Sequence, residues 1–187
     1  MTLTPKDSGW IEVITGSMFS GKTEELIRRI RRAEIAKMKT ILFKPFIDSR
    51  YSSKHVVSHN KSKLESVMVK SSDEIIKHSN KMDVIGIDEA QFFDNQIVEV
   101  CKKLADKKIR VIVAGLDTDY KGKPFGCMPE LMCESDYLDK LRAICVMCGN
   151  PASYTQRTIS NSKQVLIGET DIYEARCRNC FELPINN

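Results

Sequence analysis

Short apolar runs alternate with segments of helical periodicity over the first two thirds of the chain. Runs that are apolar almost throughout are typical of strands covered on both faces, as in a parallel sheet. The alternation therefore predicts an α/β fold in which helices flank a mainly parallel sheet. The runs interpreted as strands are Trp10–Thr15, Thr40–Lys44, Val84–Asp88 and Val111–Leu116, and the helical segments are Glu24–Met38, Ser72–Asn80 and Asn95–Lys107.

The pattern changes near Ala143. Beyond this residue the helical periodicity disappears, paired cysteines appear, and the segment Tyr154–Lys163 is polar. We therefore predict two domains, an α/β domain over residues 1–142 and a small second domain over residues 143–187.

Composition limits the classes of protein to which the chain can belong. The 187 residues suffice for one full core with a small appendage, and 42% hydrophobic with 29% charged residues argues against global disorder. A net charge of +4 permits anionic ligands without requiring nucleic acid. No aromatic side chain that could stack bases interleaves the basic residues of the first helix, so we interpret them as a solvated or subunit-contacting face, with an anion- or nucleic-acid-binding face as the alternative. These residues are Arg28, Arg29, Arg31, Arg32, Lys37 and Lys39.

Neither a membrane span nor an export signal is visible. No apolar stretch approaches the ~18 residues that a spanning helix needs. The first ten residues, MTLTPKDSGW, lack the apolar segment of a secretory signal. We expect a cytoplasmic globular protein without a membrane partner.

The sequence GSMFSGKT directly after the first predicted strand matches the phosphate-loop pattern G-x-x-x-x-G-K-[ST]. Gly16 and Gly21 allow a tight turn whose backbone N–H groups point at phosphate oxygens. Lys22 is placed to reach the β- and γ-phosphates, and the Thr23 hydroxyl is placed to bind Mg²⁺. The motif lies between a predicted strand and a predicted helix, so it indicates nucleotide binding.

A second motif, VIGIDEAQ, places two acids at the end of an apolar strand. Ligands of open α/β sheets bind at this edge, so Asp88 is a candidate Mg²⁺ ligand, directly or through water. Glu89 would lie beside the γ-phosphate. There it would polarise water in a hydrolase, or take a proton from a substrate hydroxyl in a kinase.

The segment Asp48-Ser49-Arg50 follows the second predicted strand and should emerge at the same edge of the sheet. Asp48 is a candidate for the water shell of Mg²⁺, and Arg50 for stabilising charge on a transferred phosphoryl group. A surface ion pair is the alternative interpretation of these residues.

Two CxxC pairs, Cys145/Cys148 and Cys177/Cys180, flank residues 149–176. Four thiolates in this arrangement suit tetrahedral Zn²⁺, and they leave no open position, so the site should be structural. A redox CxxC is the less favoured alternative. The segment pinned between the pairs is a candidate substrate lid. Cys101, Cys127 and Cys133 lack metal-ligand spacing and are expected to be buried.

Taken in order, GSMFSGKT, DSR at 48–50, IDEAQFF at 87–93, GLDTDYKGKPFG at 115–126 and the cysteine pairs resemble the type II thymidine kinases. The resemblance extends over about residues 9–183. It implies a P-loop NTPase-type sheet with a C-terminal zinc domain carrying a lasso-like loop. It also implies ATP- and Mg²⁺-dependent phosphorylation of the 5′-hydroxyl of thymidine, or of deoxyuridine, giving dTMP in pyrimidine salvage. Such enzymes are usually homotetramers.

The resemblance also implies residue roles. Glu89 corresponds to the catalytic base that takes the 5′-hydroxyl proton. Residues corresponding to ATP and Mg²⁺ contacts are Gly16, Ser17, Met18, Phe19, Ser20, Gly21, Lys22, Thr23, Asp48, Ser49, Arg50, Asp88, Glu89, Ala90 and Gln91. Residues corresponding to nucleoside contacts are Met18, Phe92, Tyr120, Phe125, Gln164, Val165, Leu166, Ile167, Gly168 and Tyr173.

Two positions depart from the family pattern. Tyr120 stands where phenylalanine is expected, so its hydroxyl needs a partner. Cys180 stands where relatives often carry histidine, which leaves tetrahedral Zn²⁺ feasible. Judged from the residues alone, Phe92 and Phe125 are also interpretable as ordinary core residues.

The alternative function is a nucleic-acid-dependent P-loop ATPase with a zinc ribbon, because DEAQ beside a phosphate loop is similar to a helicase signature. A helicase core uses two α/β domains of this kind, and 187 residues provide room for one. We therefore expect a small nucleoside substrate and no nucleic-acid partner.

Overall fold

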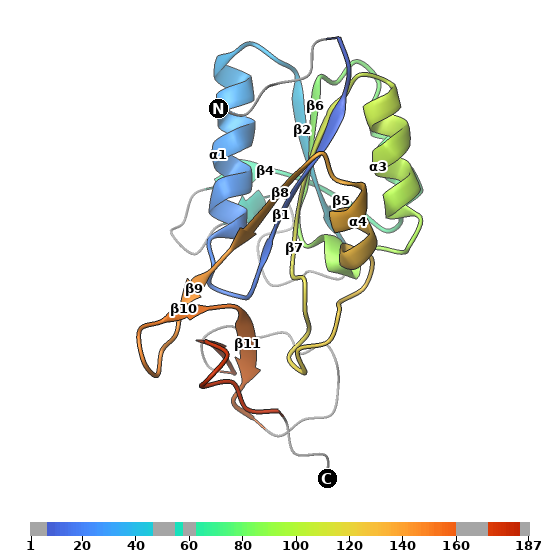
Figure 1. Ribbon diagram of the computed structural model, residues 1–187. Coiled ribbons are helices and arrows are strands. Elements are labelled where there is room, and N and C mark those ends of the chain that lie inside the picture. Colours follow the sequence, from blue (N-terminus) through green and yellow to red (C-terminus); the bar gives the residue numbers. More distant parts are fainter. Residues whose placement is uncertain (1–6, 47–54, 58–62, 160–171, 184–187) are drawn as a thin grey trace.

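The computed structural model describes residues 7–46, 55–57, 63–159 and 172–183 (Figure 1). Its centre is a six-stranded parallel sheet with the strand order β5-β2-β6-β7-β1-β8. These strands are β1 (Trp10–Gly16), β2 (Thr40–Pro45), β5 (Val67–Val69), β6 (Val84–Ile87), β7 (Arg110–Gly115) and β8 (Tyr137–Leu141). The predicted parallel sheet is thus confirmed.

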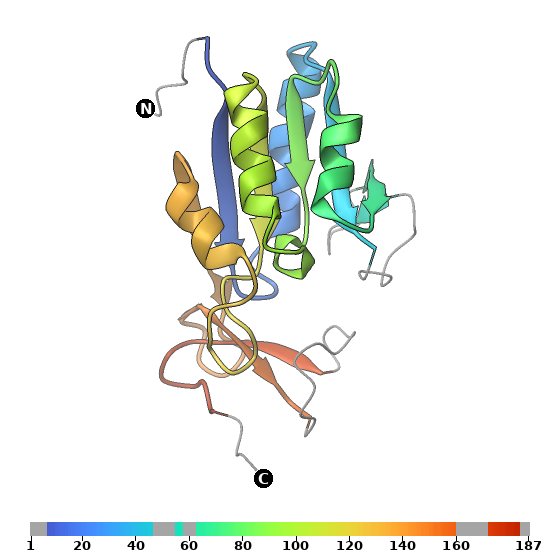
Figure 2. The same cartoon turned by 90° about the vertical axis from the view of Figure 1, so that its right-hand side faces the viewer.

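Helices cover both faces of the sheet, as predicted. In Figure 2, α2, α3 and α4 lie in front of the strands and α1 lies behind them. The helices are α1 (Lys22–Ile35), α2 (Ser72–His78), α3 (Ile97–Asp106) and α4 (Met128–Glu134), with the short 3₁₀ helix η1 (Ala90–Phe92) after β6.

Two separate apolar layers result from the alternation of side chains along each strand. Ile14 of β1 and Ile112 of β7 are buried against α1, which contributes Leu26, Ile27, Ile30 and Ala33 to this layer. Val13 and Val113 belong to the apolar layer on the opposite face, which α2, α3 and α4 cover together. A helix stripe of this kind leaves Arg28, Arg31 and Arg32 exposed on the other side, as the sequence predicted. Arg29 departs from this prediction, because its half-buried guanidinium pairs with Glu12 of β1.

Three short antiparallel strand pairs form separate sheets in the described part of the chain. The C-terminal strands lie beyond the carboxyl edge of the large sheet (Figure 1). The pairs are β3 (His55–Val57) with β4 (Lys63–Glu65), β9 (Ala143–Ile144) with β10 (Pro151–Ala152), and β11 (Tyr154–Arg157) with β12 (Tyr173–Arg176). The division into domains at residues 142 and 143 stays a prediction.

Two details complete the comparison with the sequence. Cys101 and Cys127 are buried as expected, whereas Cys133 is exposed, because it occupies the solvent side of α4. Within the described ranges, no helix combines the length and the apolar character needed to cross a bilayer.

Candidate functional site

The phosphate-loop sequence forms the turn between β1 and α1, the context that its motif requires. Gly16 and Gly21 have φ angles of 137° and 86°, in the region that side chains disfavour. A Cβ on Gly16 would also lie 2.3 Å from the carbonyl oxygen of Leu141 in β8. The two glycines therefore allow a turn that other residues could not form without strain.

Lys22 begins α1 and its ammonium group donates a 2.7 Å hydrogen bond to the carbonyl oxygen of Ser17. Burial lowers the pKa of Lys22, and the carboxylates of Glu89 and Asp88 oppose that shift. The lysine is therefore placed at the loop and close to the acids that follow β6.

Thr23 and Asp88 come together at the carboxyl edge of the sheet. The Thr23 hydroxyl donates to the carboxylate of buried Asp88 over 3.5 Å. Oxygen ligands in adjacent positions around Mg²⁺ lie ~3 Å apart, so this pair fits a shared ion. The donor set is a hydroxyl and a carboxylate, which suits a hard cation.

Glu89 follows Asp88 and has a φ angle of 53°, in the left-handed region. A non-glycine residue in this conformation carries strain of about 1–3 kcal/mol and persists only where its surroundings hold it. Gln91 donates from its side-chain amide to a carboxylate oxygen of Glu89 over 2.5 Å. Ala90, between them, accepts a hydrogen bond from the Cys127 thiol through its carbonyl oxygen.

The aromatic residues expected at the nucleoside form two groups. Phe92 and Phe125 meet edge to face, with ring centroids 5.6 Å apart. Tyr120 and Tyr173 are both buried and are joined by Arg157, which lies over both rings and donates to the Tyr173 hydroxyl over 2.9 Å. Arg157 was not predicted from the sequence, because a single arginine in a polar segment has no distinctive spacing.

The C-terminal strands contact the phosphate loop directly. The Met18 N–H donates to the hydroxyl of buried Thr155 in β11 over 3.0 Å, and the Ser17 hydroxyl donates to the Ala152 carbonyl oxygen over 3.4 Å. Thr155 too was missed, since nothing in the local sequence relates it to a loop far earlier in the chain.

Some of the predicted residues lie outside the described residues. These are Asp48, Ser49 and Arg50, together with Gln164, Val165, Leu166, Ile167 and Gly168.

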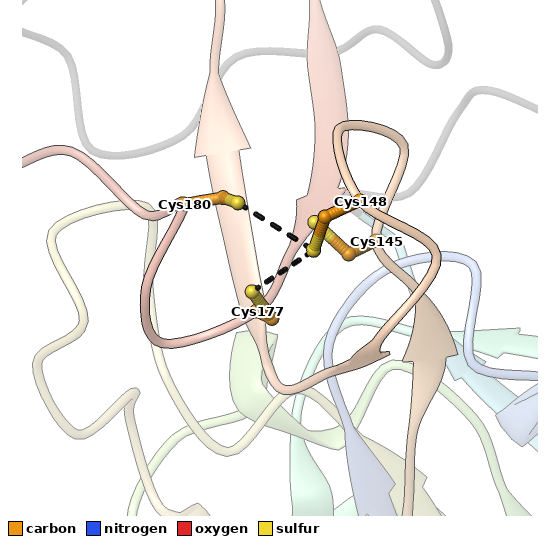
Figure 3. Close-up of side chains that lie close together, drawn as sticks. All are labelled: Cys145, Cys148, Cys177 and Cys180. Atoms are coloured by element: carbon orange, nitrogen blue, oxygen red, sulfur yellow. Dashed lines mark hydrogen bonds between the residues drawn. The ribbon is translucent and has the colours of Figure 1, made fainter.

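The two cysteine pairs converge, as Figure 3 shows. The ligand atoms of Cys145, Cys148, Cys177 and Cys180 all lie within 4.8 Å of one another. The Cys148 sulfur is 3.5 Å from that of Cys177 and 3.6 Å from that of Cys180. Bonds of ~2.3 Å in a tetrahedron place sulfur atoms ~3.8 Å apart, so the cluster fits Zn²⁺.

The thiols of this cluster differ in acidity. Burial raises the pKa of Cys145, but hydrogen bonds from the backbone at Cys177 and Met147 outweigh it and lower that pKa to about 6. The hydrogen bond with Cys148 raises the pKa of Cys180 to about 12.

The phosphate loop between β1 and α1, with the acids after β6, defines the P-loop class of nucleotide-binding proteins. Comparison with known proteins refines this assignment. The family model described as thymidine kinase matches residues 9–181. The chain is 55% identical over 173 residues to a thymidine kinase from Bacteroides thetaiotaomicron, covering 92% of this chain and 87% of the relative. It is 54% identical over 174 residues to a thymidine kinase from Bacteroides fragilis, covering 93% and 87%. The chain belongs to the thymidine kinase family.

Proposed function

We propose that the protein transfers the γ-phosphoryl group of ATP to the 5′-hydroxyl of thymidine and releases dTMP and ADP. The observation that carries this conclusion is the family match over residues 9–181, within which the phosphate loop and Glu89 converge at one sheet edge.

Glu89 is the proposed general base. Its carboxylate accepts the proton of the 5′-hydroxyl while that oxygen forms a bond to the γ-phosphorus. The bond from the γ-phosphorus to the bridging oxygen breaks, and its electron pair leaves with ADP. Lys22 lies close enough to Glu89 and Asp88 to interact with both, so its charge is available to the phosphate oxygens at the same place.

Mg²⁺ would be held by Thr23 and Asp88. When bound, it neutralises charge on the phosphate oxygens. Zn²⁺ would be held by the four cysteines and would act structurally, since four sulfur ligands complete its coordination. Bound there, Zn²⁺ would link the two cysteine pairs and so hold together the two ends of the segment between them.

The nucleoside is proposed to lie among the aromatic residues near the phosphate loop. Support comes from Thr155, which binds the backbone of Met18 and is close in sequence to Arg157, the residue that joins Tyr120 to Tyr173. Substrate residues from the two parts of the chain are thereby connected to the nucleotide loop. The proposed nucleoside contacts in the described residues are Met18, Phe92, Tyr120, Phe125 and Tyr173.

The protein is also proposed to assemble as a homotetramer. The strand β8 is the last strand at one side of the described sheet, and three of its five residues are exposed. Exposed sheet edges favour pairing with another chain. Size-exclusion chromatography with light scattering measures the mass of the assembly and distinguishes a tetramer from a monomer or dimer.

ATP consumption with a panel of acceptors tests the function. We expect turnover with thymidine, a measurable rate with deoxyuridine, and no stimulation by single-stranded DNA or RNA. The alternative, a nucleic-acid-dependent ATPase, predicts the opposite: turnover that needs a polynucleotide and ignores nucleosides. Identification of dTMP by mass spectrometry confirms that the phosphoryl group reaches the nucleoside.

A further inference from the structure

The side chain of Gln91 joins the segments that follow β6 and β7 at the proposed catalytic centre. It is buried on η1, and its oxygen accepts a 3.0 Å hydrogen bond from the N–H of Leu116, directly after β7. A main-chain N–H can only donate, so this contact fixes which end of the amide is the oxygen. The amide nitrogen is therefore directed at the Glu89 carboxylate, 2.5 Å away.

The backbone of the β7 end and of the turn before α4 packs closely against Gln91. A Cβ on Gly115 would lie 2.8 Å from the side-chain oxygen of Gln91. A Cβ on Gly126, whose φ is +52°, would lie 2.4 Å from the Gln91 carbonyl oxygen. The glycines let the backbone approach this closely: Gly126 packs against the main chain of Gln91, and Gly115 packs against its side-chain amide.

Glu89 needs a support of this kind. Its left-handed backbone conformation is strained, so the place of its carboxylate depends on the groups that hold it. A general base must also meet the reacting hydroxyl accurately, because a displacement of about 1 Å can cost roughly 10²-fold in rate.

We propose that Gln91 is a positioning residue for the phosphoryl transfer: it anchors the Glu89 carboxylate to the end of β7. This inference rests on the proposed function, since it assigns a role within the same reaction. It gives the Gln91 side chain a task different from the nucleotide contact expected from its motif. The amide donates to one carboxylate oxygen and leaves the proton of the 5′-hydroxyl to be accepted by Glu89.

Two substitutions separate the bond to Glu89 from the bond to Leu116. Gln91→Glu has the same size and keeps an oxygen for the Leu116 N–H, but it replaces the donor facing Glu89. Gln91→Met removes both hydrogen bonds without adding charge. We expect both variants to lose about 10- to 100-fold in kcat, with KM for ATP and thymidine changed less than about threefold. Gln91→Asn, which is too short to make both bonds, serves where Gln91→Met fails to fold.

The decisive measurement repeats each substitution in a Glu89→Gln background. A residue that acts only through Glu89 should cause no further loss once the base is gone. We therefore expect the residual kcat of Glu89→Gln to change less than about threefold when either Gln91 variant is added. Thermal melting and ATP binding confirm that each protein is folded.

Three outcomes overturn the proposal. The first is a wild-type kcat in Gln91→Glu, which would show that the Gln91 amide matters only for its bond to Leu116. The second is a fall in kcat on adding a Gln91 substitution to Glu89→Gln that is as large as the fall on adding it to the wild-type protein. The third is an undiminished kcat in Glu89→Gln itself. Failure of the proposed function is distinct, because the wild-type protein would then produce no dTMP.

Discussion

The guanidinium carbon of Arg157 lies 3.5 Å from the centroid of the Tyr120 ring, and Arg157 also donates to the hydroxyl of Tyr173 over 2.9 Å. Tyr120 belongs to the turn after β7, whereas Arg157 ends β11 and Tyr173 begins β12. One buried arginine thus connects two residues proposed to hold the nucleoside. A cation over an aromatic face contributes about 2 kcal/mol when it is desolvated, so this contact helps to hold Tyr120 against β11.

Replacing Arg157 should weaken thymidine binding selectively. Arg157→Met keeps much of the length and loses both the charge and the hydrogen bond. We expect KM for thymidine to rise about tenfold or more, with KM for ATP changed less than about threefold. Tyr173→Phe is the matched control, because it removes only the hydrogen bond and should cost about fivefold. An unchanged thymidine KM in Arg157→Met would contradict this role.

Glu89→Gln should separate chemistry from binding. The amide preserves the shape of the side chain but cannot accept the 5′-hydroxyl proton. We expect kcat to fall by about 10²- to 10⁴-fold while the affinities for ATP and thymidine stay nearly the same. Steady-state kinetics and equilibrium titration measure the two effects. A kcat within about threefold of wild type would exclude Glu89 as the base.

Lys22 and Thr23 should respond differently to substitution. Lys22→Ala removes the cation that we propose acts on the transferred phosphoryl group, and it should abolish phosphorylation in a folded protein. Thr23→Ser keeps the hydroxyl that faces Asp88 and should be tolerated. Thr23→Val, which is isosteric but lacks the hydroxyl, should raise the Mg²⁺ concentration needed for half-maximal rate. Equal damage from the serine and valine variants would argue against metal binding by Thr23.

Loss of zinc should release the substrate segment before it affects nucleotide binding. Zinc in a Cys₄ site contributes folding energy on the order of 10 kcal/mol in isolated peptides. The large sheet has its own two apolar layers and should not need the metal. For Cys145→Ser we expect zinc content to fall and thymidine binding to weaken while ATP binding survives. Cys133→Ser, at an exposed cysteine outside the cluster, should leave zinc content, thymidine binding and ATP binding unchanged. Normal thymidine affinity in a zinc-free variant would show that zinc is not needed for thymidine binding.

Glu12 should make stability depend on pH. Burial raises the pKa of Glu12, but hydrogen bonds from Arg110 and Trp10 outweigh it, so this pKa lies below the ordinary value of 4.5. A depressed carboxyl pKa stabilises the folded protein above pH 4.5, and the stabilisation is lost as the pH falls through the folded-state value. Glu12→Gln removes the buried acid that Arg29 and Arg110 share. Arg29 keeps its pairs with Glu25 and Asp139, so the substitution should cost about 2 kcal/mol at pH 7.

The measurement is the difference in unfolding free energy between wild type and Glu12→Gln across the acid range. We expect this difference to shrink as the pH falls below 4.5. Glu99→Gln is the control, since Glu99 forms an exposed pair with Lys102 and should change stability by less than about 1 kcal/mol. A difference that is constant with pH would show that the Glu12 charge is not responsible.

Some features were predictable because they are local in the chain. The phosphate loop lies within residues 16–23 and each cysteine pair within four residues, so their chemistry can be recognised from spacing alone. The strands β1, β2, β6 and β7 are buried on both faces and apolar almost throughout, and these apolar runs therefore revealed them. The edge strand β8 was missed, because its exposed residues Leu138–Lys140 give it no such run.

The tertiary structure determined how the phosphate loop, the acidic residues and the C-terminal strands are placed relative to one another. The orientation of Gln91 depends on the N–H of Leu116, and Arg157 reaches Tyr120 only because β11 lies beyond the carboxyl edge of the sheet. Such contacts follow from strand order, register and the direction of each side chain, which no local spacing encodes. The sequence by itself determined which groups are available for phosphoryl transfer and metal binding. The fold alone determined which buried polar side chains hold those groups in place, because hydrogen bonds between distant segments form only once the segments have packed together.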